Sequence, residues 1–362
     1  MRSLKVGSQV GCSAGEALGD ANVNDATRHK VTILTHHADG AEIPWVRFLL
    51  GDWAGDVVED PDHQVIVPES LVICDRLDDL PVPYLAEVRR LATAGLLHTG
   101  DRRYRARLAA YPSFAWVWRT YHHTALTDLA LRQLPLGPAA FPVVSADPLP
   151  AALRRPVERR CTWSFVGEPT TSVGAMLDAF SSIEHGQHDV VSSVPANGSG
   201  PPARDPAGDL ALLADTVFAP CPMGRVHLES SRIYDALEVG AIPIVERRRW
   251  LDYFTSLLGE HPLPTARSWP EAAEYVQRVL ADPHALGALQ HEVLTWWTVT
   301  KRTLAAAVQE DVAEVVTDEG VAPTWTDSPP LDRPAPRWRN RIETLRHHDM
   351  PALKARLHRR PH

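Results

Sequence analysis

The chain is poor in cysteine and in long apolar runs, and each shortage excludes a class of protein. Its 362 residues contain four cysteines that are widely scattered and form no CxxC pair. This spacing excludes a zinc framework and a disulfide scaffold, and free thiols fit a reducing compartment. No run of about 18 apolar residues could span a bilayer, and residues 1–19 lack the apolar core of a signal peptide. We therefore expect a cytoplasmic protein with no membrane span.

The chain also lacks an excess of positive charge, since its formal net charge is −8. A dedicated nucleic-acid binder needs lysine and arginine to neutralise phosphates, so this balance argues against a nucleic acid as partner. Residues 337–362 are locally basic, with eight lysines and arginines against two acids. We interpret this stretch as a solvated helix or tail that packs on the acidic body, with a contact to an anionic partner as the alternative.

Length and apolar patterning predict two α/β domains. A chain of 362 residues exceeds what one hydrophobic core usually organises, so two domains of roughly 150 to 200 residues are expected. Apolar runs typical of buried strands alternate with amphipathic stretches, which predicts parallel sheets covered by helices. The predicted strands are residues 30–34, 70–74, 95–98, 114–119, 161–166, 189–194, 216–219 and 242–245, and the predicted helices include 84–93 and about 296–316.

Proline marks the boundary between the domains. Six prolines between Pro135 and Pro156 cannot continue a helix or a central strand, so we place the interdomain linker there. The resulting units are an N-terminal domain in residues 1–150, a C-terminal domain in 151–317 and a Pro-rich, then basic, tail in 318–362. A second stretch rich in proline and glycine, residues 195–208, predicts a loop. We expect two Rossmann-like parallel-sheet domains with a cleft between them.

The most informative segment, residues 215–245, has the order strand, loop, helix, glycine stop and strand. Gly224 lies in the loop, and the helix is expected to open near Ser230 and Ser231. A helix N-terminus after such a loop presents unpaired N–H groups and the positive end of the dipole, which together favour a phosphate. Arg232 lies in the first turn, where a cation is unfavourable unless a bound diphosphate pairs with it.

Asp235 follows Arg232 by three residues and therefore lies on the same helix face. One ligand could touch Arg232 through its phosphates and Asp235 through a ribose hydroxyl. The alternative is a surface ion pair between these two residues beside the serine caps. The segment thus predicts a nucleotide diphosphate site.

This segment resembles the C-terminal signature of the exostosin-like glycosyltransferases. The signature runs Cys-Pro-x-Gly and, a few residues later, Ser-x-Arg-x-x-Glu-Ala-Leu-x-x-Gly-x-Ile-Pro. Asp235 stands where the family usually has Glu, and residues 160–167 resemble the family's Phe-x-Gly element, which ends here at Gly167. The matching residues are Cys221, Pro222, Gly224, Ser230, Arg232, Ala236, Leu237, Gly240, Ile242 and Pro243.

A weaker resemblance lies in the N-terminal half. Residues 95–101, 118–121 and 134–137 are similar to a bacterial and fungal subgroup with His-x-Gly-Asp-Glu, Arg-x-Tyr and Pro-Leu-Gly in that order, although Arg102 replaces the final acid. The resemblance makes His98, Arg119 and Tyr121 candidates to line the cleft. Their alternative role is surface or interdomain packing.

The resemblance implies a GT-B enzyme in which the C-terminal domain binds the donor and the N-terminal domain mainly binds the acceptor. It implies inversion at the anomeric carbon by direct displacement, with no cofactor and no bound metal. The expected partners are a nucleotide sugar donor and a small-molecule or oligosaccharide acceptor, in bacterial natural-product or cell-surface glycan biosynthesis. The implied donor-site residues are Gly167, Pro222, Gly224, Arg225, Ser230, Ser231, Arg232 and Asp235.

Inverting displacement requires a general base near the acceptor hydroxyl, normally in the N-terminal domain. Asp101, at the end of a predicted strand, is the first candidate, and Asp39 and Asp75 are rivals at comparable strand ends. The alternative for Asp101 is a turn or a helix cap. Adjacent histidine pairs have no cysteine or carboxylate at ligand spacing, so no metal site is expected.

Two other functions remain open from the sequence. A nucleotide-sugar-modifying enzyme, such as an epimerase, could use the same two-domain scaffold, because a fold does not fix its chemistry. A non-catalytic sugar-nucleotide or glycan-binding protein could retain the donor site without a base. An inverting glycosyltransferase remains the leading interpretation.

Overall fold

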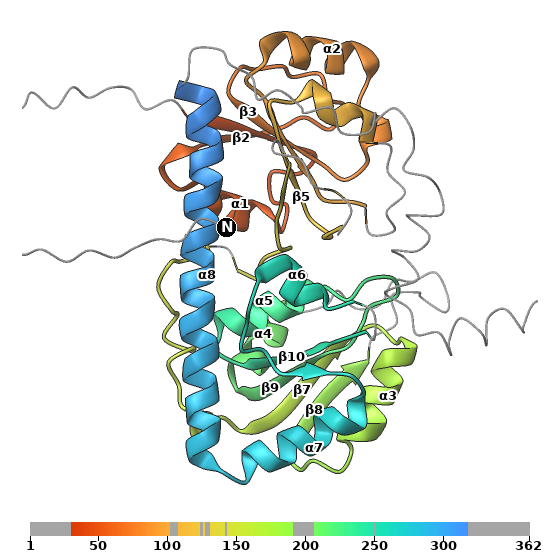
Figure 1. Cartoon of the computed structure of the whole chain (residues 1–362), viewed down its shortest axis with the longest axis vertical. Coiled ribbons are helices and arrows are strands. Elements are labelled where there is room, and N and C mark those ends of the chain that lie inside the picture. Colours follow the sequence, from red (N-terminus) through yellow and green to blue (C-terminus); the bar gives the residue numbers. More distant parts are fainter. Residues whose placement is uncertain are drawn as a thin grey trace, which may run out of the picture.

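The computed structural model describes residues 30–101, 108–123, 126, 131–141, 143–190, 206–248 and 251–317. The predicted tail 318–362, most of the predicted loop 195–208 and Arg102 lie outside the described residues. The described chain forms two α/β lobes stacked along the long axis of the molecule, and helix α8 (Pro283–Thr317) runs beside both of them (Figure 1). Among the described residues, no helix is both long enough and apolar enough to cross a membrane.

The N-terminal lobe is built on a parallel six-stranded sheet in the order β2-β1-β3-β4-β5-β6. Every residue of β3 is buried, as expected for a central strand covered on both faces. The strands are β1 (Val31–Thr35), β2 (Ala54–Glu59), β3 (Ser70–Cys74), β4 (Gly95–His98), β5 (Trp116–Arg119) and β6 (Leu131–Gln133). The helices are α1 (Ile43–Leu50) and α2 (Val82–Leu91), with short 3₁₀ turns at Gly51–Trp53, Leu77–Asp79 and Leu108–Ser113.

The C-terminal lobe is built on a parallel five-stranded sheet in the order β11-β10-β9-β7-β8. Its strands are β7 (Cys161–Gly167), β8 (Gly186–Val190), β9 (Thr216–Cys221), β10 (Ile242–Glu246) and β11 (Thr265–Ala266). Its helices are α3 (Thr171–Phe180), α4 (Pro206–Ala214), α5 (Ser231–Glu238), α6 (Tyr253–Leu258) and α7 (Trp269–Leu280), and a 3₁₀ turn at Pro156–Glu158 precedes β7.

The two sheets share one winding pattern. In each, the second strand lies on one side of the first strand and the third lies on the other side. The winding therefore reverses between β1 and β3 and between β7 and β9, and ligands of open α/β sheets bind beyond the carboxyl ends of strands at such points. The prediction of two parallel-sheet α/β domains is confirmed.

Each of the eight predicted strands overlaps an observed strand, with starts displaced by at most three residues. For the predicted strand 189–194 only the first two residues overlap β8, and residues 191–194 lie outside the described residues. The strands β2, β6 and β11 were not predicted, because they lie toward the edges of their sheets and their partial burial leaves no continuous apolar run. Helix α8 begins at Pro283, well before the predicted start near residue 296. Pro283 and Gly287 weaken the helical signal in this part of the sequence.

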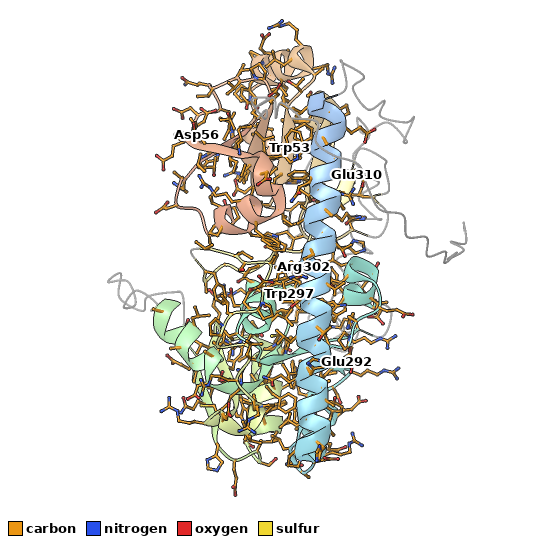
Figure 2. All side chains as sticks on the ribbon, turned by 90° about the vertical axis from the view of Figure 1, so that its left-hand side faces the viewer. Trp53, Asp56, Glu292, Trp297, Arg302 and Glu310 are labelled. Atoms are coloured by element: carbon orange, nitrogen blue, oxygen red, sulfur yellow. The ribbon has the colours of Figure 1, made fainter. Side chains whose placement is uncertain are left out.

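Helix α8 is attached to both lobes, and Figure 2 shows it passing from one lobe to the other. Near its C-terminal end, Asp311 accepts a hydrogen bond from Trp118 Nε1 (2.9 Å) and forms an ion pair with Arg132 of the N-terminal sheet. Near its N-terminal end, Gln290 Nε2 donates to the carbonyl oxygen of Gly240 at 2.8 Å. One rigid element therefore links the two sheets.

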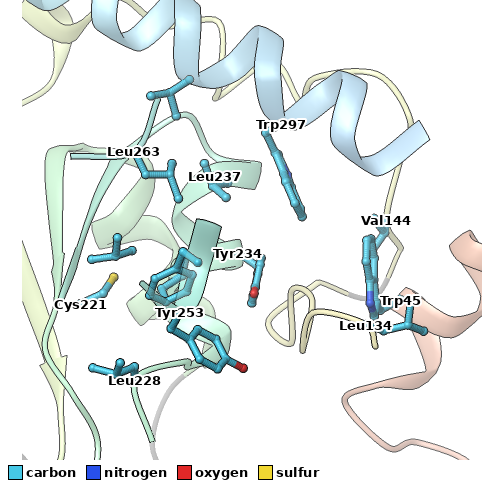
Figure 3. Close-up of a cluster of buried hydrophobic side chains, with 14 of the residues drawn as sticks. Trp45, Leu134, Val144, Cys221, Leu228, Tyr234, Leu237, Tyr253, Leu263 and Trp297 are labelled. Atoms are coloured by element: carbon cyan, nitrogen blue, oxygen red, sulfur yellow. The ribbon is translucent and has the colours of Figure 1, made fainter. Parts of the chain in front are cut away.

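Midway along α8, Lys301 forms a buried ion pair with Glu238, the last residue of α5. The side chains of both residues are 2% exposed, and Lys301 Nζ lies 2.9 Å from Glu238 Oε1. Lys301 Nζ also donates to the carbonyl oxygen of Ser145 in the linker at 2.6 Å, and Trp297 Nε1 donates to Glu238 at 2.8 Å. Stacking of Trp297 on Trp45 of the N-terminal lobe, with ring centroids 6.1 Å apart, extends this contact across the junction (Figure 3).

We expect Lys301→Met to lower the free energy of unfolding by about 3 to 5 kcal/mol, because the variant leaves the Glu238 carboxylate buried without its cation. Arg302→Met is the matched control on the same helix. Its partner Asp147 is mostly exposed, so the expected loss is less than about 1 kcal/mol. Urea unfolding of both variants measures the difference, and equal losses would contradict a stabilising role for the buried pair.

Candidate functional site

A cavity of about 870 Å³ lies at the junction of the two lobes, and the carboxyl ends of both sheets contribute to its wall. Asp75, Thr99 and Thr120 line it directly after β3, β4 and β5 of the N-terminal sheet. Gly167 and Pro222 line it at the ends of β7 and β9 of the C-terminal sheet. The cavity therefore occupies the position where doubly wound sheets bind ligands.

The structure brings all eight predicted donor-site residues to this cavity. Seven of them lie after β9, in the loop and in the first turns of α5, and Gly167 lies at the end of the neighbouring strand β7. The lining residues concerned are Gly167, Pro222, Gly224, Arg225, Ser230, Ser231, Arg232 and Asp235. Their roles in binding a donor remain predictions.

Local sequence explains how α5 enters the cavity wall. Ser230 has an extended backbone (φ −146°, ψ 152°) and forms the N-cap, so the helical N–H groups of α5 begin at Ser231. Gly240, after the helix, adopts φ +70°, and a Cβ there would lie 2.5 Å from the carbonyl oxygen of Ala152. A side chain at position 240 would therefore displace the linker from the end of α5.

Arg232 has a fixed position in the cavity wall. Its Nη2 donates to the carbonyl oxygen of Ser164 on β7 at 2.6 Å, and its guanidinium lies 5.5 Å from the ring centre of Phe165. These contacts hold the cation against the strand that ends at Gly167. An anion at the N-terminus of α5 would meet a guanidinium that is already oriented.

Arg225 is the second arginine among the described lining residues. Its Nε lies 3.0 Å from Glu168 Oε2, so an ion pair joins the loop after β9 to the residue that follows Gly167. Both side chains are about half exposed. The pair bridges the two glycine-containing loops of the predicted donor site.

Asp235 holds the interdomain linker. Its Oδ1 accepts hydrogen bonds from the backbone N–H groups of Ala139 and Ala140 at 2.8 and 3.0 Å. Burial raises the pKa of Asp235, whereas these two hydrogen bonds and Arg232 lower it. A contact from Asp235 to a ribose, as the sequence predicts, would have to share the carboxylate with the linker.

Asp101, the first predicted base, lies behind the cavity in a buried polar cluster. Its Oδ2 forms an ion pair with Arg119 Nη2 at 2.9 Å, and Arg119 is fully buried. Arg119 Nη1 also donates to the hydroxyl of Tyr111, which lies 2.8 Å from His98 Nδ1. None of these four residues is among the described residues that line the cavity.

The pKa values of His98 and Arg119 shift in opposite directions in this cluster. Burial lowers the pKa of His98 to about 3, with a further contribution from the Arg119 cation. Burial alone would lower the pKa of Arg119, but Tyr111 and Asp101 raise it above its usual value. The cluster therefore consists of a neutral His98 beside the Arg119 cation, which is paired with Asp101.

The rival carboxylates have different positions. Asp75 is exposed and lines the cavity at the end of β3, whereas Asp39 is exposed outside the lining. A Cβ at Gly100 would lie 1.7 Å from the carbonyl oxygen of Asp75, so the glycine allows the end of β4 to pack against this residue. Glu42, at the start of α1, also lines the cavity and was not predicted. Its position depends on tertiary structure and has no local signature.

Tyr121 lines the cavity as predicted for a cleft residue, whereas His98 and Arg119 lie behind the wall. Sequence reasoning missed Glu229, a buried carboxylate of the lining that precedes the N-cap of α5. The sequence did contain a signal for this residue, because a glutamate directly beside a predicted anion site is unusual. Among the described residues, no group of three or more His, Cys, Asp or Glu side chains could hold a metal ion.

No known protein family and no curated protein matches the sequence. Solved structures similar to the chain include an α1,3-fucosyltransferase (12% identity, 82% of this chain and 92% of that chain, TM-score 0.44). They also include Anabaena HepE in complex with UDP and glucose (10%, 79% and 99%, TM-score 0.47) and T4 phage BGT in complex with UDP and Mn²⁺ (8%, 78% and 99%, TM-score 0.39). No family match supports the exostosin-like assignment, which stays a prediction.

We expect Asp101→Asn to lower the free energy of unfolding by about 3 kcal/mol, because it leaves the buried Arg119 cation without a charged partner. Asp75→Asn, which changes an exposed carboxylate, should alter stability by less than about 0.5 kcal/mol. Urea unfolding at neutral pH compares the two variants. A fully stable Asp101→Asn protein would show that the ion pair is dispensable and would favour a role for Asp101 in turnover.

Proposed function

We propose that the chain is an inverting glycosyltransferase of GT-B type, which transfers a sugar from a nucleotide diphosphate sugar to a hydroxyl group of a small-molecule or oligosaccharide acceptor. One observation carries the proposal. A single cavity joins a helix N-terminus with two arginines, from the C-terminal lobe, to the carboxylates Asp75 and Glu42 of the N-terminal lobe. We place the enzyme in bacterial natural-product or cell-surface glycan biosynthesis, where such acceptors occur.

The C-terminal side supplies what a diphosphate leaving group requires. The N–H groups of the first turn of α5, which have no acceptor one turn earlier in the helix, and the hydroxyls of Ser230 and Ser231 offer hydrogen-bond donors, and Arg232 offers a charged donor in a fixed position. Negative charge grows on the diphosphate as its bond to the anomeric carbon breaks. Oriented donors that stabilise this charge lower the barrier without a bound metal.

The N-terminal side supplies the base. In an inverting reaction, a carboxylate removes the proton of the acceptor hydroxyl while the acceptor oxygen attacks the anomeric carbon and the nucleotide diphosphate leaves. We propose Asp75 for this role, with Glu42 as the second carboxylate on that side of the cavity. Asp101 and Asp39, which lie outside the described lining, are then positioning or surface residues.

We expect one nucleoside diphosphate among UDP, GDP, dTDP and ADP, or CMP, to raise the melting temperature at millimolar concentration, because binding to the native state stabilises it by mass action. Arg232→Ala should weaken the binding of that nucleotide by about 1.5 to 3 kcal/mol, the usual contribution of a charge-assisted hydrogen bond. Calorimetric titration measures the loss. Arg247→Ala is the control, because Arg247 pairs with Asp252 outside the described lining. The proposal fails if no nucleotide binds.

We expect Asp75→Asn to lower kcat by about 10² to 10⁴ and to leave nucleotide affinity unchanged, because removal of a general base slows the proton transfer without touching the donor site. Glu42→Gln should lower kcat less. Product analysis with the identified donor must find a transferred sugar in the wild-type reaction. If Glu42→Gln lowers kcat more than Asp75→Asn does, the base is Glu42. If neither variant lowers kcat, neither carboxylate is the general base.

A further inference from the structure

The loop that precedes α5 contains a carboxylate that is buried where three parts of the chain meet. Glu229 is 4% exposed and lies directly before the N-cap Ser230. Its Oε1 accepts a hydrogen bond from the backbone N–H of Leu136 in the linker at 2.8 Å and another from the hydroxyl of Tyr234 in α5. Its Oε2 accepts a hydrogen bond from the hydroxyl of Tyr253, the first residue of α6.

Tyr253 extends this network into the other lobe. Its hydroxyl donates to Glu229 and accepts a hydrogen bond from the backbone N–H of His122, at 3.0 Å, beyond the end of β5. His122 Nε2 lies 2.7 Å from Ser256 Oγ of α6, which adds a second contact between the same two segments. The path His122, Tyr253, Glu229 thus joins the N-terminal sheet to the start of α5 through two hydrogen bonds.

Hydrogen-bond donors reach both oxygens of the Glu229 carboxylate. A buried charge is tolerated only when hydrogen bonds replace its water, and three donors surround Glu229. Burial raises the pKa of Glu229, whereas the hydrogen bonds from Tyr234, Tyr253 and Leu136 lower it. A glutamine side chain has one acceptor oxygen and would leave one of these donors unsatisfied.

The segment held by Tyr253 carries backbone strain. Tyr121, next to His122, has φ +57°, which is rare for a bulky residue and costs on the order of 1 to 3 kcal/mol. Its ring meets the ring of His227 edge to face, with centroids 4.9 Å apart, and His227 meets Tyr253 in the same way at 4.8 Å. Tyr121 and His227 both line the cavity. Contacts with the C-terminal lobe therefore help to hold the strained turn in place.

We propose that the Tyr253 hydroxyl, anchored by Glu229, is a positioning group that fixes the Thr120–Tyr121 edge of the acceptor side against the start of α5. The inference rests on the proposed function, because the two sides must meet for sugar transfer. Donor binding involves the C-terminal lobe, so loss of the hydroxyl should spare nucleotide affinity and lower kcat. A reactant displaced by about 1 Å can lose 10²-fold in rate.

Measurements of kcat and of nucleotide Kd compare Tyr253→Phe with Tyr234→Phe. Each variant removes one tyrosine hydroxyl from Glu229, but the Tyr234 bond stays within the C-terminal lobe. Figure 3 shows the side chains of both tyrosines. We expect Tyr253→Phe to lower kcat roughly tenfold at unchanged nucleotide Kd, whereas Tyr234→Phe stays within about twofold of wild type in both. Equal kcat losses in the two variants, or a weaker nucleotide Kd in Tyr253→Phe alone, would overturn the proposal.

A distance measurement tests the positioning without turnover. Two spin labels report the separation of the lobes. They are attached at the exposed positions Val82→Cys on α2 and Glu274→Cys on α7, in a Cys12→Ser background. The distance distribution should broaden in Tyr253→Phe and stay narrow in Tyr234→Phe and in the parent. An unchanged distribution in Tyr253→Phe would overturn the proposal. Broadening in a chain that binds no nucleotide would reject the proposed function and keep the interdomain role of Tyr253.

Discussion

The position of α5 is the constraint on which the site depends, and buried carboxylates hold this helix along its whole length. Glu229 before the helix, Asp235 within it and Glu238 at its end each accept hydrogen bonds from the linker or from α8. A carboxylate at a helix C-terminus is unfavourable for the dipole, and Lys301 offsets that cost at Glu238. The N-terminus of α5 is therefore presented to the cavity by contacts made on the other sides of the helix.

Two segments that looked independent in the sequence meet at this helix. The Pro-Leu-Gly segment of the linker supplies the N–H of Leu136 to Glu229, and the next residues supply those of Ala139 and Ala140 to Asp235. These partners are more than 90 residues apart in the chain. Each carboxylate has a structural role beside any role toward a ligand. The spacing of residues within one helix suggests a ligand role for Asp235. The contact of Asp235 with the linker can be recognised only from the tertiary fold.

The part of the cavity wall that we propose as the donor side was predictable from the sequence because it is local. One strand, one loop and one helix start in consecutive residues bring Gly224, Ser230 and Arg232 to the cavity. The proposed acceptor side depends on which strand ends become neighbours, and the sequence alone does not specify the order of the strands. Asp101 and Asp75 both follow buried strands, yet the first turns inward to Arg119 while the second lines the cavity. The same local pattern thus leads to opposite placements.

Among the described residues, three separate attachments join the lobes: the linker, α8, and the path from His122 through Tyr253 to Glu229. Two bodies joined at three places cannot rotate relative to one another unless one attachment breaks or bends. A buried ion pair is costly to break, and a continuous helix resists bending, whereas the third attachment consists of single hydrogen bonds, those of Tyr253 and that between His122 and Ser256, each with a net contribution of about 0.5 to 1.5 kcal/mol. The contact between His122 and α6 is therefore the attachment at which the orientation of the two lobes is most easily changed.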